Sequence, residues 1–397
     1  MANSRVTFAD VQRAESRIKD AIKRTPCARS DALSESLHAD IHLKLENLQL
    51  TGSFKARGAL NRLLDLSDDE KQRGVIAASA GNHAQGVAHH AQRLGLRAVI
   101  VMPQATPMVK VERTRGFGAE VVLHGDSFDA ARDLALQLAA EQGLTFVHPF
   151  DDPLVIAGQG TMALEMLRAQ PAIDTLVVAV GGGGLISGIA TAVRALKPTI
   201  EIIGVQASQF PAMVNAVKGT QHPQGNSTIA EGIAVGVPGQ ITRRLIKERV
   251  DDLVLVDEGD IEQAIVMLLE IEKTLVEGAG AAGGPKRYGP PRQCRRDARM
   301  QVYLPIAEMS VDALLLVGIG LGVGAGAGAH RWRRGGVRDD RGGVEPTHRS
   351  HHARVRGSAR ARERKPHAQA RCIRARRNPS RSARVAHAPA RRGAGCS

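Results

Sequence analysis

Residues 175–188 read TLVVAVGGGGLISG, and this stretch decides the fold class. Its first six residues have the length and the apolar, β-branched composition of a buried strand, and four consecutive glycines then lead into a segment of helical composition. A strand that is apolar on both faces is typical of a parallel sheet covered by helices on both sides. The stretch therefore predicts a strand–turn–helix unit of an α/β protein.

The same pattern recurs along the chain on either side of this unit. Segments of helical length, such as 129–141 and 157–167, alternate with short apolar runs that we interpret as strands. Those runs are residues 41–46, 75–78, 98–101, 120–123, 145–148, 201–205 and 252–256. A further helix is predicted over 10–24, before the Thr25-Pro26 stop. We predict that the strands form two parallel sheets rather than one.

The four glycines at 181–184 follow the carboxyl end of a strand and precede a helix. Backbone N–H groups that carry no side chains, at the positive end of a helix dipole, can wrap a phosphate group. The alternative is a flexible turn or a site of close helix packing. The spacing fits neither a dinucleotide fingerprint nor a nucleotide P-loop. We favour a phosphate site of another kind.

A second unusual loop follows the strand at 75–78 and reads SAGNHAQG at 79–86. Asn82 could donate to a phenolate or carbonyl oxygen, and the loop amides could hold a carboxylate. The alternative is that Ser79 and Asn82 only cap the following helix. His83 is interpreted as a helix-start residue without a catalytic role.

Residues 51–58 read TGSFKARG and place Lys55 in the first turn of a predicted helix, with Ser53 as its N-cap. The positive end of the helix dipole disfavours an ammonium group there and favours the neutral amine. A neutral lysine amine forms Schiff bases with carbonyl compounds, which is how enzymes hold pyridoxal 5'-phosphate (PLP). The alternative is a solvated surface lysine.

The charge of this 397-residue chain is divided unevenly. Residues 284–397 hold 24 Arg and 2 Lys against 7 acidic residues, whereas residues 1–283 carry a net charge of −5. The first part resembles an ordinary soluble protein, and no membrane span is expected. Cys27 is the one cysteine before residue 284, and the N-terminus has no apolar signal core. We therefore expect a reducing, cytoplasmic location.

Five stretches together resemble the threonine dehydratases (threonine ammonia-lyases), which belong to the tryptophan-synthase-β-like, fold type II PLP enzymes. They are KLENLQ at 44–49, TGSFKARG at 51–58, SAGNHAQG at 79–86, IAGQGT at 156–161 and GGGGLISG at 181–188. The resemblance runs from about residue 5 to residue 283. It implies two α/β domains with the cofactor between them, a small one at 48–148 and a large one at 1–47 plus 149–283.

The resemblance also implies a role for each matching residue. Lys55 would bind PLP covalently, Phe54 would lie against the cofactor ring and Asn82 would bond its 3-hydroxyl group. The cofactor phosphate would be bound by Gly181, Gly182, Gly183, Gly184 and Leu185. The substrate carboxylate would be bound by Ser79, Ala80 and Gly81.

The reaction implied is β-elimination, from L-threonine to 2-oxobutanoate and ammonia, or from L-serine to pyruvate. It would serve isoleucine biosynthesis or threonine catabolism in a homo-oligomer, a dimer or tetramer, with no specific nucleic-acid or membrane partner. Ala80 favours dehydration, because racemases of this group carry a serine there as a second acid/base. The divalent-metal site of those relatives would fall on Gln206 and Ala212, so we expect no metal site.

The resemblance ends near residue 284, where GPKRYGPP interrupts a small-residue segment. The family would continue with a strand and a Ser/Cys-Gly-Gly-Asn turn that contacts the pyridine nitrogen, and no Gly-Gly-Asn follows here. We interpret 284–397, a tail rich in Arg, Gly and Ala, as an out-of-frame translation that replaces the last core elements and a regulatory domain. The rival interpretation is an inactive remnant whose basic, disordered tail binds nucleic acid nonspecifically.

Overall fold

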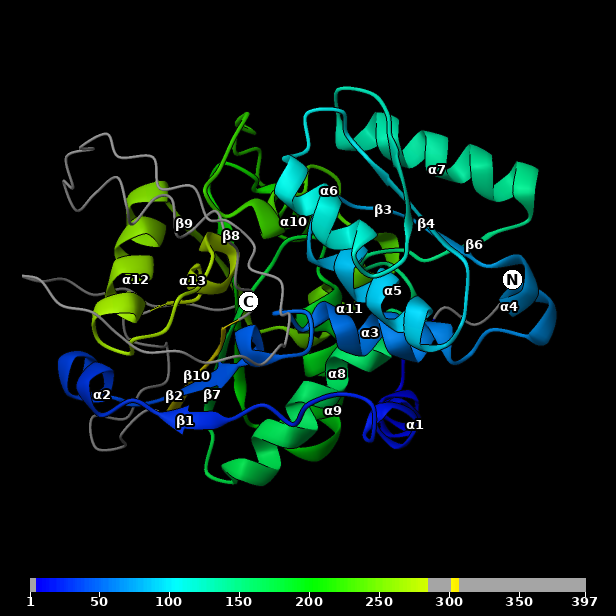
Figure 1. Cartoon of the computed structure of the whole chain (residues 1–397). Helices are drawn as coiled ribbons and strands as arrows, with labels where there is room; N and C mark the ends of the chain where they lie inside the picture. Colours follow the sequence, from blue (N-terminus) through cyan, green and yellow to red (C-terminus); the bar gives the residue numbers. More distant parts are fainter. Residues whose placement is uncertain (1–4, 285–300, 307–397) are drawn as a thin grey trace, which may run out of the picture. The chain divides into compact units, whose positions relative to one another are not determined.

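The computed structural model describes residues 5–284 and 301–306, which all lie in one compact unit of the chain, Met1–Gly326. The strands of this part form two sheets, one of six strands and one of four (Figure 1). Every strand pairing is parallel except β1 with β2. The predicted α/β class with two parallel sheets is therefore confirmed.

The six-stranded sheet has the order β1-β2-β10-β7-β8-β9. Its strands, in chain order, are Cys27–Arg29 (β1), Asp40–Leu45 (β2), Thr175–Ala179 (β7), Glu201–Ala207 (β8), Asp252–Val256 (β9) and Gln301–Ile306 (β10). Ala179 pairs with Val205, and Ala207 pairs with Val256. The carboxyl ends of β7, β8 and β9 therefore meet at one edge of the sheet, where α/β proteins bind ligands.

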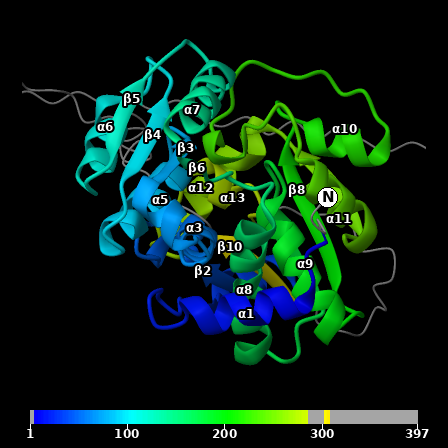
Figure 2. The same cartoon turned by 90° about the vertical axis from the view of Figure 1, so that its right-hand side faces the viewer.

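The four-stranded sheet has the order β5-β4-β3-β6. Its strands are Val75–Ala78 (β3), Ala98–Met102 (β4), Glu120–Leu123 (β5) and Thr145–Phe146 (β6). Alternate β3 residues face opposite sides: Val75 and Ala77 pack with the core under α5 and α6, and Ile76 and Ala78 pack with the core under α7. Figure 2 shows α7 on one side of this sheet and α5 with α6 on the other.

Thirteen α-helices and two short 3-10 helices accompany the sheets in the described residues. The α-helices are Phe8–Ile18 (α1), Asp31–Leu37 (α2), Lys55–Leu63 (α3), Asp68–Arg73 (α4), Asn82–Arg93 (α5), Met108–Arg115 (α6), Phe128–Gln142 (α7), Pro153–Ala169 (α8), Gly184–Leu196 (α9), Ala212–Lys218 (α10), Gln240–Arg249 (α11), Glu258–Glu270 (α12) and Gly278–Ala281 (α13). The 3-10 helices are Glu46–Leu48 (η1) and Glu231–Ile233 (η2). α1 is shorter than predicted and ends at Ile18.

The central strand β7 is buried on both faces, as its composition predicts. Leu176 and Val178 pack in one core with residues of α8 and α9, and Val177 packs in a second core with residues of α12 and α13. We call the four-stranded sheet with α4–α7 the four-stranded lobe, and the six-stranded sheet with its helices the six-stranded lobe. Both contribute to the site described below.

The sheet is more complete than the sequence predicted. Gln301–Ile306, inside the segment interpreted as an out-of-frame tail, forms β10 between β2 and β7, where Tyr303 pairs with His42 and Leu176 (Figure 1). The expectation that the sheet lacks a core strand there is therefore wrong. QVYLPI holds Val, Tyr and Ile, which suit a strand, but its short signal is lost in the average composition of the tail.

The rest of that segment, residues 285–300 and 307–397, lies outside the described residues. All strands of the four-stranded sheet fall within the predicted small domain, 48–148, and the six-stranded sheet takes strands from both sides of it. The domain limits themselves stay a prediction.

Candidate active site

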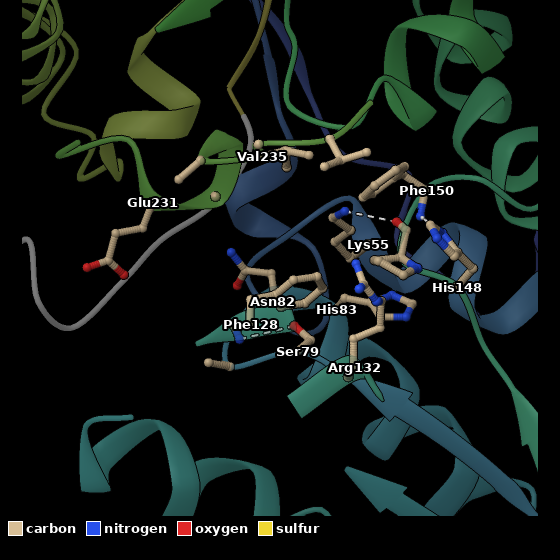
Figure 3. A pocket seen from close by; sticks show the side chains of 18 of the residues that line it. Lys55, Ser79, Asn82, His83, Phe128, Arg132, His148, Phe150, Glu231 and Val235 are labelled. Carbon is tan, nitrogen blue, oxygen red and sulfur yellow. Dashed lines mark hydrogen bonds between the residues drawn. The ribbon is translucent and has the colours of Figure 1, made fainter. Parts of the chain in front are cut away.

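A cavity of about 680 Å³ is lined by residues of both lobes. Five residues that the sequence singled out line it together: Lys55, Ser79, Ala80, Gly81 and Asn82. Figure 3 shows the side chains of Lys55, Ser79 and Asn82 around this space. The fold therefore brings the predicted lysine and the predicted anion-binding loop to one place.

Lys55 is the first residue of α3, at the positive end of the helix dipole. We predicted Ser53 as the N-cap, but the N-cap is Phe54, because the helix begins one residue later than expected. The Ser53 hydroxyl instead accepts from the Lys55 backbone N–H at 3.1 Å. The Lys55 Nζ atom donates to the Pro149 carbonyl oxygen at 3.0 Å (Figure 3). The amine is thus held at the cavity wall.

A glycine of α5 allows that helix to pack closely on the start of α3. A Cβ atom at Gly86 would lie 3.3 Å from the backbone of Lys55 and Ala56. Any larger side chain at this position would push the two helices apart. Gly86 therefore contributes to the placement of Lys55.

The loop that begins at Ser79 follows the carboxyl end of β3. The Ser79 N–H donates to the Val101 carbonyl at 3.1 Å, and the Ser79 hydroxyl accepts from the Gly81 N–H at 3.2 Å. Asn82 does not cap α5, whose N-cap is Gly81; its Nδ2 atom donates to Glu277 Oε1 at 2.8 Å. The capping alternative is therefore wrong for Asn82, whose amide faces the cavity.

The cavity also holds residues that sequence reasoning missed. Glu277 lines it and accepts from Asn82, and the segment after β6 supplies His148, Pro149 and Phe150. Pro149 follows a predicted strand, so its position at a carboxyl end was a usable signal. For Glu277, a single acidic residue before GAGAAGG, no local pattern indicates a cavity.

The glycine loop borders the cavity through Phe150 and does not line it directly. A Cβ atom at Gly182 would lie 2.3 Å from the Phe150 ring, and one at Gly184 would lie 3.0 Å from Phe150. Gly183 has a φ of +90°, which favours glycine. The glycines thus allow Phe150, a cavity residue, to approach the amino end of α9.

Besides the four glycines, two more predicted cofactor contacts lie outside the lining of the cavity. Phe54 is 9% exposed and packs in the large hydrophobic core, and Leu185 packs in the same core. The Phe54 ring centroid is nevertheless 5.3 Å from Lys55 Nζ. Both residues flank the site, and their predicted contacts with a cofactor stay predictions.

Burial controls the electrostatics beside Lys55. It lowers the pKa of His83 to about 3, helped by the nearby Lys55 charge, and it also lowers the pKa of His148. The His83 ring is neutral and donates through Nε2 to the Val147 carbonyl at 2.9 Å. His83 thus acts as a buried support between α5 and the chain after β6.

This burial predicts a stability that falls in acid. Because the folded-state pKa of His83 is below its unfolded value, acid protonates this side chain more readily in the unfolded chain. The contribution of His83 to the free energy of unfolding is therefore fully present above about pH 6.5, and below that pH it falls by up to about 1.4 kcal/mol per pH unit. Urea unfolding at pH 7 and pH 5 should show this loss, and His83→Gln should remove about 2 kcal/mol of it. The same change at the exposed His222 should leave the slope unchanged. Equal slopes in all three proteins would contradict the prediction.

The position at which the resemblance puts the metal ion of the racemase-like relatives has another role in this chain. Gln206 is fully buried, and its Oε1 atom accepts from the N–H groups of Met213 and Val214 at the start of α10. In the described part of the chain, no group of three or more His, Cys, Asp or Glu side chains could hold a metal ion. In the same residues, no helix combines the length and the apolar composition of a membrane span.

Known proteins that are similar to this chain include an L-threonine ammonia-lyase, a threonine deaminase and a serine racemase. The chain is 48% identical over 280 residues to the L-threonine ammonia-lyase of Thermotoga maritima, a match that covers 70% of each protein. The processed threonine deaminase isoform 2 of Solanum lycopersicum is 36% identical, with a TM-score of 0.71 over 79% of this chain and 88% of that one. Maize serine racemase is 29% identical, with a TM-score of 0.73 over 80% of this chain and 98% of that one.

Residues 18–284 match the family described as pyridoxal-phosphate dependent enzyme, which is more than half of the chain. That range contains Lys55, the Ser79–Asn82 loop and the glycine loop. The chain therefore belongs to the pyridoxal-phosphate dependent enzymes, on the threonine dehydratase branch of that family.

Proposed function

We propose that this chain is a threonine ammonia-lyase, which converts L-threonine to 2-oxobutanoate and ammonia. The observation that carries the proposal is one cavity that holds both the Lys55 amine and the Ser79–Asn82 loop. The names of the Thermotoga and Solanum relatives support threonine as the substrate. The amine supplies the base, and the loop supplies the carboxylate site.

The residues present fit PLP. The amine of Lys55 would bind the cofactor carbonyl carbon, and Asn82 would donate to the ring hydroxyl. The phosphate would be bound by the backbone N–H groups of Gly181, Gly182, Gly183, Gly184 and Leu185, at the amino end of the 13-residue helix α9. The Phe150 ring, which lines the cavity, lies against Gly182 of this loop.

Different residues of the chain have different roles in the elimination. Lys55, as the neutral amine, removes the α-proton of the substrate, while Ser79, Ala80 and Gly81 hold its carboxylate. When bound, PLP supplies an electron sink for the electron pair that this proton leaves behind. The β-hydroxyl takes up one proton and leaves as water, which balances the α-proton that Lys55 removes. The enamine that remains tautomerises and hydrolyses to 2-oxobutanoate and ammonia.

The direct test is to incubate the purified full chain with PLP and L-threonine and to measure 2-oxobutanoate. We expect release that depends on both PLP and threonine. A chain that attaches PLP at Lys55 but releases no 2-oxobutanoate would contradict the proposal. That result would instead favour the inactive remnant with a basic, nucleic-acid-binding tail.

We predict that threonine is preferred over serine. Phe128, Phe150 and Val235 line the cavity, so the β-methyl group of threonine would gain apolar contact. Burying one methyl group is worth about 0.8 kcal/mol, so kcat/KM should favour threonine by roughly fourfold. Initial rates on the two amino acids measure this ratio. Val235→Thr, which keeps the size but adds a hydroxyl, should reduce it, and an unchanged ratio would exclude Val235 as its cause.

Ala80 separates dehydration from racemisation, the activity named for the maize neighbour. Its methyl group cannot exchange a proton, so we expect no D-amino acid among the products. We further propose a cytoplasmic homo-oligomer, a dimer or tetramer, that serves isoleucine biosynthesis or threonine catabolism. Light scattering of the purified chain would measure the subunit number.

A further inference from the structure

A buried cluster of charged residues lies beneath the helix that carries Lys55. We call Lys44, Glu46, Arg57 and Glu165 the buried quartet. The first three are 0% exposed and Glu165 is 9% exposed. With two cations and two anions, the quartet is neutral as a whole. Nothing in the elimination reaction described above uses it.

Arg57 is the centre of the quartet. Its Nε and Nη2 atoms donate to the two carboxylate oxygens of Glu46 at 2.8 and 2.7 Å, a bidentate fork. Its Nη1 and Nη2 atoms donate to Glu165 at 2.6 and 3.0 Å, and Nη1 also reaches the Thr161 hydroxyl at 3.2 Å. The guanidinium is therefore fixed in its plane by contacts from two sides.

These partners belong to elements of the six-stranded lobe. Lys44 is on β2, Glu46 is on η1, and Glu165 is on α8. Lys44 Nζ donates to Glu165 at 2.5 Å and to the Thr25 carbonyl at 2.7 Å, and the Thr25 hydroxyl donates to Glu46 at 2.5 Å. Arg57 is the one member that lies on α3.

Arg57 lies two positions after Lys55, which is a rotation of about 200° around an α-helix. Lys55 therefore faces the cavity from one side of α3, and Arg57 enters the core from the opposite side. The next residue, Gly58, sets how closely α3 packs on α8. A Cβ atom at Gly58 would lie 2.7 Å from the Val155 carbonyl, and the Gly58 N–H donates to Gln159 Oε1 at 3.1 Å. A fork on the far side then fixes the rotation of α3 about its axis.

Removing four charged side chains from water costs free energy. We therefore interpret the buried quartet as an arrangement that fixes geometry rather than one that adds stability. Burial alone would raise the pKa of Glu46, but the Arg57 charge and hydrogen bonds lower it overall. Apolar residues of similar volume often stabilise a core as well as a buried ion pair does. A lysine could supply the charge at position 57 but not the planar fork.

We propose that Arg57 is a positioning residue for Lys55: its fork to Glu46 and Glu165 sets the rotation of α3 and so aims the Lys55 amine into the cavity. The inference rests on the proposed function, because it concerns how the same lysine meets the cofactor carbonyl. A misplacement of about 1 Å at a reacting group can cost about 100-fold in rate.

The test compares Arg57→Lys with a matched control, Thr25→Val, in the full chain. Both changes weaken contacts with the same buried carboxylate, Glu46, but Thr25 does not belong to α3. Two quantities are measured besides melting temperature: the rate at which added PLP attaches to Lys55, followed by its visible absorbance and by borohydride trapping, and the steady-state kcat and KM on threonine.

We expect Arg57→Lys to slow attachment and to lower kcat, each by at least about tenfold, with KM changed less than about threefold. The Thr25→Val variant should attach PLP at the rate of the unmodified chain, even if its melting temperature falls as far as that of Arg57→Lys. If Arg57→Lys behaves like Thr25→Val, the inference is overturned. If Arg57→Lys does not fold, Glu46→Gln tests the same fork from the other side, with the same two outcomes.

The two proposals fail in different ways. An unmodified chain that attaches no PLP at Lys55 would overturn the proposed function, and the inference with it. Attachment in the unmodified chain together with equal rates in both variants would overturn only the positioning role of Arg57.

Discussion

Lys55→Ala is expected to abolish 2-oxobutanoate release, with kcat lower by at least about 1,000-fold. The amine is the proposed base for the α-proton, and positioned acid/base groups typically contribute about 100- to 10,000-fold. The same change removes the group that would bind the cofactor covalently. Coupled assays of 2-oxobutanoate measure the first loss, and borohydride trapping followed by mass spectrometry measures the second.

Lys110→Ala is the matched control for this change. Lys110 also lines the cavity, where its Nζ atom pairs with Glu231 at 2.7 Å, but it has no place in the proposed chemistry. We expect its turnover to stay within a few-fold of the unmodified chain, because its partner Glu231 is 73% exposed and solvent weakens such an ion pair. If Lys55→Ala folds, binds PLP covalently at another lysine and turns over normally, the catalytic assignment is wrong.

The sequence predicted the parts of the site that depend on local pattern. Lys55 begins a helix, and the loop from Ser79 follows the strand Val75–Ala78, so each could be recognised from a few residues on either side. The carboxyl ends of parallel strands then place such loops at one edge of a sheet. That rule explains why residues so far apart in sequence meet at one cavity.

The sequence could not predict contacts that arise only from tertiary packing. Phe150 against Gly182, and Glu277 against Asn82, join segments with no shared pattern. The Phe54 side chain packs in the hydrophobic core with its ring centroid 5.3 Å from Lys55 Nζ, and its contact with the cofactor ring stays a prediction. One residue of shift at the helix start, from Ser53 to Phe54 as N-cap, also lies within the ordinary error of helix boundaries.

Composition misled most where it was averaged over a long segment. The tail from residue 284 carries 24 Arg, so its composition as a whole is strongly basic. That overall composition hid the six-residue run that forms β10. A short strand beside β2 and β7 is stabilised by backbone pairing with its neighbours, whatever the character of the residues around it. Strand signals therefore have to be read in windows of strand length.

Lys44→Met is expected to destabilise the fold by about 3–5 kcal/mol. The change removes one of the two cations that pair with the buried Glu165 carboxylate and leaves a net negative charge in the quartet. Lys44 Nζ is 2.5 Å from Glu165 and 3.7 Å from Glu46, and its side chain is 0% exposed. The double variant Lys44→Met/Glu165→Gln removes the unbalanced charge and should recover part of the loss. Urea unfolding of the three proteins at pH 7 measures these free energies.

The control is a lysine whose ion pair lies in solvent. Lys71 pairs with Asp68 at 3.0 Å, but the two side chains are 44% and 91% exposed, so Lys71→Met should cost less than about 1 kcal/mol. Similar losses at Lys44 and Lys71 would show that burial adds nothing to the quartet. A large loss at Lys44 alone, partly restored by Glu165→Gln, would show that the quartet acts as one balanced unit. The geometry of Arg57, and through α3 the direction of Lys55, would then depend on charges that the substrate never touches.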